Sequence, residues 1–150
     1  MPLPILKEFD LKHPDHELAA LVQEAMASPE MDAENFGNVL ESLGEQDWVG
    51  SAFAPSLKYV IDYIEKHEVK QQSSLLTPLA WSLMVFCETT PIECKPEFKE
   101  DFQNSLRKVN RLFADCFCET ESIYCLIGMA AASGQTEAAR SLWELQSESV

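Results

Sequence analysis

The sequence has few positively charged residues. It carries 11 lysine and arginine residues against 25 aspartate and glutamate residues, which gives a formal net charge of −14 at pH 7. Because nucleic acids and anionic membranes are bound mainly through lysine and arginine, we expect neither as a direct partner. A cationic protein partner, metal ions or simple solubility remain as explanations for the excess of acidic residues.

Catalytic motifs are also lacking. No G-x-S-x-G, P-loop, H-E-x-x-H or G-x-G-x-x-G sequence occurs in the chain. Nucleophilic catalysis needs a serine or cysteine beside a base, but His13, His16 and His67 lie in polar segments away from the cysteines. We therefore expect a protein that is not an enzyme and that holds no cofactor. An enzyme or metal protein built on the cysteines is a third hypothesis.

The cysteines do not match a metal-binding pattern. The five are Cys87, Cys94, Cys116, Cys118 and Cys125. None of their spacings forms the C-x2-C pair that zinc sites favour. An odd number of cysteines, mostly in apolar helical stretches, is typical of a reducing compartment, where cysteine acts as a small hydrophobic residue. We expect no metal site, although Cys116 and Cys118 are close enough along the chain to oxidise if both are exposed.

Long hydrophobic runs and a secretion signal are missing as well. The longest apolar run, Leu75 to Cys87, is interrupted by polar residues and a proline, and it is too short to span a membrane. The first residues lack the apolar core and cleavage site of a signal peptide. These observations predict a cytoplasmic protein.

Glycines and alternating β-branched residues are scarce, whereas helical hydrophobic patterns follow one another along the chain. Five glycines and no alternating runs leave little room for a sheet. The length of 150 residues suits a single domain. We therefore predict one all-α domain of about seven antiparallel helices, built as a compact bundle or as an irregular HEAT- or TPR-like stack of helix pairs. Prolines oppose a helix at the start, so residues 1–14 are predicted to form an extended arm.

Capping residues and prolines give the expected boundaries of the first four helices. Asp15 should cap the first helix, and a second helix should begin at Ser28-Pro29 and end at Gly44. After a loop at 44–54, Pro55 should open the third helix. Thr77-Pro78 should open the fourth, which is apolar nearly all round and should therefore be central.

The same signals mark the last three helices. Pro96 should begin the longest helix, which runs to about Cys118, and Thr120 should cap an apolar helix that ends at Gly134. Thr136 should cap the final helix. The expected hydrophobic anchors of that final helix are Leu142, Trp143 and Leu145.

Negative charge is concentrated at the N-terminal end. Residues 1–50 contain eleven acidic and two basic residues and so hold −9 of the total charge of −14. Acidic residues near helix starts complement the helix dipole, and others form a solvated face. Trp48 follows the densest part of this acidic stretch, where it is either a lid on the core or an exposed interface anchor.

The C-terminal region resembles a known class of proteins. Small residues at Gly128, Ala131 and Ala132 allow a neighbouring helix to approach closely, Gly134 suits a left-handed turn, and a new helix with the pattern A-A-x-x-L-W-x-L follows at once. Together with its size and acidity, this hairpin is similar to the small all-helical immunity proteins of bacterial contact-dependent and polymorphic toxin systems. The similarity covers roughly the last thirty residues.

This resemblance implies neutralisation of a toxin by tight binding. Many such toxins are nucleases with basic clefts, which an acidic inhibitor complements. The residues that would then face the toxin are Glu30, Asp32, Glu34, Glu41, Glu45, Asp47, Trp48, Asp62 and Glu65. The alternative is a non-catalytic helical adaptor or scaffold with no toxin partner, in which the charge serves only solvation.

Overall fold

The fold is all-helical. The computed structural model describes residues 15–44, 49–88 and 96–148, and within these ranges it contains seven helices and no strand. The helices are α1 (Asp15–Ala27), α2 (Ala33–Gly44), α3 (Val49–Glu65), α4 (Val69–Glu88), α5 (Pro96–Thr120), α6 (Ile123–Ala132) and α7 (Thr136–Glu148). The predicted all-α class and number of helices are confirmed, whereas the predicted arm at 1–14 lies outside the described residues.

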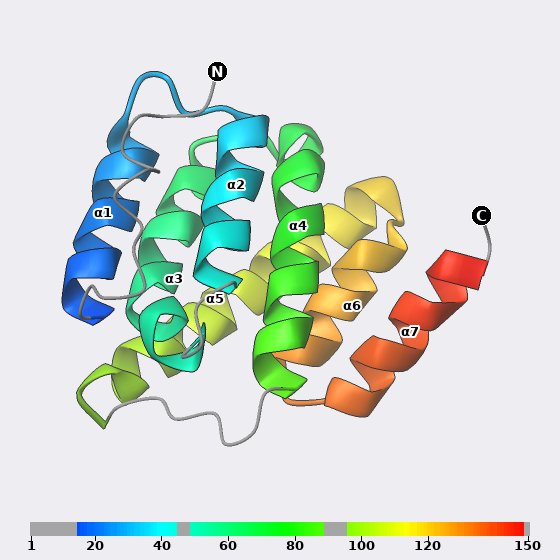
Figure 1. Cartoon of the computed structure of the whole chain (residues 1–150). Coiled ribbons are helices and arrows are strands. Elements are labelled where there is room, and N and C mark those ends of the chain that lie inside the picture. The colour runs from blue at the N-terminus through cyan, green and yellow to red at the C-terminus, as the bar shows by residue number, and fades with distance from the viewer. Residues whose placement is uncertain (1–14, 45–48, 89–95, 149–150) are drawn as a thin grey trace.

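Helix α4 lies at the centre of the arrangement. It packs against α2, α3, α5, α6 and α7, while α1 packs chiefly against α3 at one end and α7 against α6 at the other. Figure 1 shows α2 and α4 side by side, with α5 passing behind them. The core therefore continues from one end of the molecule to the other through the helices that α4 contacts.

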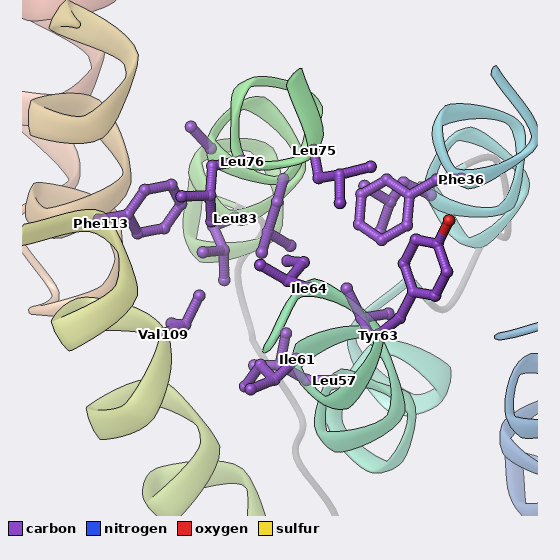
Figure 2. Packing of buried hydrophobic residues seen from close by; sticks show 14 of the residues in the cluster. Phe36, Leu57, Ile61, Tyr63, Ile64, Leu75, Leu76, Leu83, Val109 and Phe113 are labelled. Atoms are coloured by element: carbon purple, nitrogen blue, oxygen red, sulfur yellow. The ribbon is translucent and has the colours of Figure 1, made fainter. Parts of the chain in front are cut away.

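The core is built from apolar side chains contributed by several helices. Figure 2 shows side chains of α3, α4 and α5 meeting in one cluster, with Phe36 and Tyr63 stacked at its edge. The labelled aliphatic and phenylalanine side chains are almost completely buried, and they are Phe36, Leu57, Ile61, Ile64, Leu75, Leu76, Leu83, Val109 and Phe113. Hydrophobic burial of this kind is the main stabilising contribution to a fold of this size.

Two prolines lie inside helices, which corrects the predicted starts of α3 and α4. Pro55 is the seventh residue of α3 and Pro78 the tenth of α4. The missing amide of Pro78 leaves the carbonyl of Ser74 without its usual partner, but Ser74 is on the exposed side of α4, where water can satisfy it. Burial of Leu75 and Leu76 favours a longer helix despite this loss.

Three other predicted boundaries are also wrong. The helix α2 begins at Ala33 and not at Pro29, because Asp32 caps it. Ser122, not Thr120, accepts the capping hydrogen bond of α6, from the amide of Tyr124. The Thr120 hydroxyl instead donates to the carbonyl of Cys116, 2.9 Å away. Thr136 is the first residue of α7 and not its cap, since the carbonyl of Gln135 already accepts from Ala139.

The hairpin of α6 and α7 forms as predicted, with one exception. Gly134 has a φ of +82°, the left-handed conformation that the turn requires. Gly128 lies directly against the ring of Phe113 on α5, so the absence of a side chain permits the close approach of α5 and α6. Trp143 packs edge-on against Tyr124 of α6. Leu145, in contrast, is 57% exposed and does not anchor α7 in the core.

Candidate functional site

Four of the predicted partner-binding residues lie together in sequence and structure. Glu30 and Asp32 belong to the turn before α2, and Glu34 and Glu41 lie on α2 itself. All four side chains are exposed. We call these four residues the acidic edge. Glu45, Asp47 and Trp48 lie outside the described residues.

Hydrogen bonds hold the turn that presents the acidic edge. The Asp32 carboxylate accepts from the amide of Asn35 at 2.8 Å, the usual N-cap contact. The Asn35 side chain donates to the carbonyl of Glu30, and the buried Tyr63 hydroxyl donates to the carbonyl of Met31. The first turn of α2 is thus fixed to α3, so the carboxylates here extend from a backbone of defined position.

Tyr63 is influenced by this turn. Its pKa is raised, first because burial disfavours the charged phenolate and second because the Asp32 carboxylate lies nearby. The phenol therefore stays neutral and keeps its hydrogen bond to Met31 at ordinary pH. His67, two residues beyond the end of α3, packs edge-on against the same ring, and its Nδ1 lies 3.0 Å from the carbonyl oxygen of Tyr63.

No ion pair among the described residues neutralises the charge of the acidic edge. From Ala33 to Gly44 there is no lysine or arginine, and none occurs anywhere between Lys12 and Lys58. Within the described ranges, no ion pair involves any of its four carboxylates. Such a surface produces a negative potential that attracts cations and cationic proteins.

Asp62 and Glu65 lie in a different place. Both are exposed residues of α3, but they line hollows between α3 and α5, whereas Tyr63 of the same helix faces Phe36 of α2. The structure therefore separates these two predicted residues from the acidic edge. We call the region that they line the α3–α5 groove.

The α3–α5 groove is lined by both signs of charge. Its first hollow, of about 420 Å³, is lined by Lys58, Ile61, Asp62, Asp101, Asn104, Ser105 and Lys108. Its second, of similar volume, is lined by Glu65, Arg107, Lys108, Arg111, Leu112 and Asp115. Lys58 and Asp101 form an ion pair at 3.7 Å, and the charges of the remaining side chains nearly balance. A groove of this composition favours a polar segment that carries both signs.

Two of the cysteines are core residues. Cys116 and Cys125 are buried, and Cys118 is exposed. Burial, and next the contact with Cys116, raise the pKa of Cys125 to about 12, so its thiol is neutral and weakly nucleophilic. Nowhere in the described ranges do three or more His, Cys, Asp or Glu side chains come together to form a metal-binding group. Cys94, His13 and His16 lie outside those ranges.

Sequence reasoning missed one exposed aromatic residue. Trp81 lies on α4, which the sequence marks as central and apolar all round, yet its side chain is 40% exposed. The sequence from Gln71 to Cys87 contains no charged residue. The pattern of this segment therefore does not indicate which side of α4 faces water, and the exposure of Trp81 could not be predicted from it. Among the helices described, none has both the length and the apolar character needed to cross a membrane.

Comparison with known proteins gives no relative. No protein family, curated protein or solved structure matches this chain. The similarity to immunity proteins therefore rests on the C-terminal hairpin, the size and the charge alone.

Proposed function

We propose that this protein is a cytoplasmic immunity protein, which binds a basic toxin domain and blocks it through the acidic edge. The single observation that carries the proposal is the set of exposed carboxylates on and before α2, none of which is paired within the described ranges. Their backbone is held by the Asp32 cap and the Tyr63 hydrogen bond. A backbone of defined position loses little freedom when a partner binds, and surface charge raises the rate of association.

A nuclease is the toxin that this surface fits best. Nuclease clefts are basic because they bind a polyanion, and a row of carboxylates on a rigid helix can occupy the same positions as phosphates. Direct binding of nucleic acid by the acidic edge itself is disfavoured, since like charges repel. The protein needs no catalytic group or cofactor for this task.

Charge reversal on α2 tests the proposal. The proposed function predicts that a toxin domain is encoded next to this gene, and the partner for the assay is an inactive variant of that domain. The Glu34→Lys/Glu41→Lys double variant should bind that domain at least about tenfold more weakly, mainly through slower association. Glu100→Lys/Glu144→Lys changes the net charge equally on exposed residues of α5 and α7 and should leave affinity close to the original.

The Glu100→Lys/Glu144→Lys control shows whether binding depends on the charge of the acidic edge or only on the net charge of the protein. Equal weakening by both double variants would mean that only net charge matters, and unchanged affinity in the α2 variant would remove the acidic edge from the function. Neither variant should lower the melting temperature, because all four side chains are exposed and unpaired within the described ranges. Affinity should also fall steeply with salt, since charges at the surface are screened within about 8 Å at physiological ionic strength.

A helical adaptor is the second candidate, and the α3–α5 groove favours it. Two hollows of about 420 Å³ with charges of both signs suit an extended polar segment better than they suit a uniformly basic cleft. Lys108 lines both hollows. If the adaptor function is correct, Lys108→Glu should abolish partner binding while Glu34→Lys/Glu41→Lys leaves it intact.

A further inference from the structure

The outward face of α4 is apolar although it faces solvent. Pro78, Trp81 and Val85 are spaced three and four residues apart, which places them on one side of the helix. Trp81 is 40% exposed, and Pro78 and Val85 are only half-buried. We call these three residues the Trp81 stripe. A helix that is apolar on all sides is normally covered on all sides, so the exposed indole of Trp81 on the central helix indicates a place for a partner.

The acidic edge lies next to the Trp81 stripe. Helices α2 and α4 pack against each other and run in the same direction (Figure 1). Phe36 of α2 and Leu75 of α4 belong to the same buried cluster (Figure 2). Glu41 lies in the last turn of α2 and Trp81 lies on the neighbouring α4, and both side chains are exposed. An apolar centre therefore lies one helix away from carboxylates that no described residue neutralises.

We propose that the Trp81 stripe and the acidic edge form one docking surface for a cationic amphipathic segment of the partner protein. The proposal rests on the proposed function and specifies the chemistry of the bound element. An apolar side chain of that segment would pack on the indole of Trp81, and its lysine or arginine residues would meet Glu41 and Glu34. An apolar centre with a charged rim is the usual composition of a protein interface, and tryptophan contributes disproportionately to binding.

Charge selects this occupant over the alternatives. A second copy of the chain would bring the same acidic edge against itself, and the net charge of −14 opposes that association. An acidic segment would be repelled by Glu34 and Glu41. An arginine of the partner would make two favourable interactions, one with the carboxylates and one by stacking over the indole ring.

Two synthetic peptides test the proposal. One is a short helical peptide of arginine and leucine that is amphipathic, and the other has serine in place of every leucine and so tests charge alone. Binding of each labelled peptide is followed by fluorescence anisotropy at physiological salt. The protein should bind the leucine peptide at least about tenfold more tightly than the serine peptide. Trp81→Ala should reduce that ratio to near one, while Leu145→Ala, which truncates an exposed leucine on α7, should preserve it.

A second substitution at Trp81 shows whether a loss of binding is caused by unfolding. Trp81→Lys keeps a long side chain on α4, and it should also abolish the preference for leucine. Circular dichroism then establishes that each variant remains helical. A leucine preference that survives in both Trp81 variants, or a wild-type ratio near one, would overturn the role of the stripe.

The result for the acidic edge is read separately. Glu34→Lys/Glu41→Lys should lower the affinity for both peptides by the same factor, because it removes the attraction for the arginine residues and leaves the apolar contact with leucine unchanged. If that variant weakens neither peptide, the acidic edge and with it the proposed function fail. If the α2 double variant lowers the affinity for both peptides but Trp81→Ala leaves the ratio of the two affinities unchanged, the proposed function stands. In that case only the docking role of Trp81 is lost.

Discussion

At the scale of single residues, Gly128 shows how closely the sequence controls packing. A methyl group at this position would overlap the ring of Phe113, which is completely buried on α5. Overpacking of a well-packed core costs about 1–3 kcal/mol. We expect Gly128→Ala to lower the free energy of unfolding by about that amount in urea titrations, even though alanine is the better helix former.

Gly37 provides a matched control on another helix. Nothing lies within 4 Å of the position that a methyl group would occupy there. Gly37→Ala should therefore raise the free energy of unfolding by about 0.5–1 kcal/mol, the usual gain in helix propensity. If both substitutions stabilise the protein, the close approach of α5 and α6 at Gly128 is not as tight as the structure shows.

The buried thiol of Cys125 predicts a dependence of stability on alkaline pH. Its pKa is raised from 9.0 to about 12, mainly by burial. Between these values the unfolded chain loses the thiol proton and the folded chain keeps it, so the unfolded state binds fewer protons and stability falls as the pH rises. The contribution of this group is about 1.4 kcal/mol per pH unit across that interval.

The comparison with Cys125→Ala isolates this effect. Thermal melts of the two proteins from pH 8 to beyond pH 10 should show the wild type losing more stability than the variant. Tyrosine and lysine titrations affect both proteins alike and cancel in the difference. Parallel curves would contradict the assigned cause.

At the scale of elements, α2 begins where a carboxylate caps it. Asp32 accepts from the amide of Asn35 at 2.8 Å, and it belongs to the acidic edge as well. Asp32→Ala should lower the free energy of unfolding by about 1 kcal/mol, whereas Asp32→Asn keeps a capping oxygen and should cost much less. Denaturant titrations of the two variants measure the difference, and equal losses would show that charge rather than capping stabilises the turn.

The same pair separates stability from binding. Asp32→Asn removes a charge but retains the cap. Any loss of affinity for the partner in that variant is therefore due to the missing charge in the acidic edge. Asp32→Ala removes both. If only Asp32→Ala abolishes binding of the partner, binding requires an ordered turn and does not require the charge of Asp32.

The element boundaries show where local signals mislead. Pro55 and Pro78 were expected to start helices because proline suits a first turn, but both lie inside longer helices. The stretches before them contain buried residues such as Ala54, Leu75 and Leu76, and burial outweighs the loss of one backbone hydrogen bond. Pro96 begins α5 as predicted.

At the scale of the whole molecule, charge is distributed unevenly. The residues from Asp15 to Gly44, which form α1 and α2, contain no lysine or arginine, whereas Arg107, Lys108 and Arg111 lie close together on α5. A net charge of −14 favours expansion of the chain through self-repulsion. The ion pair between Lys58 and Asp101 joins exposed side chains.

Added salt should therefore stabilise the protein. Raising sodium chloride from about 0.01 M to about 0.15 M shortens the Debye length from about 30 Å to about 8 Å. This change screens the repulsion among the excess carboxylates more than it weakens exposed ion pairs such as Lys58–Asp101. The melting temperature followed by circular dichroism should rise by a few degrees. A fall would mean that attractive pairs outweigh the repulsion across the molecule.

The sequence alone determined the all-helical class, the number of helices, the apolar stripes and the tight hairpin at Gly134, because hydrophobic period and capping act between residues close together in the chain. Only the tertiary structure decided that Trp81 is exposed, that Leu145 faces away from the core, and that Asp62 and Glu65 face α5 and not the acidic edge. Those outcomes depend on which helix covers which face. That choice is made by contacts between distant segments, and no local pattern records it.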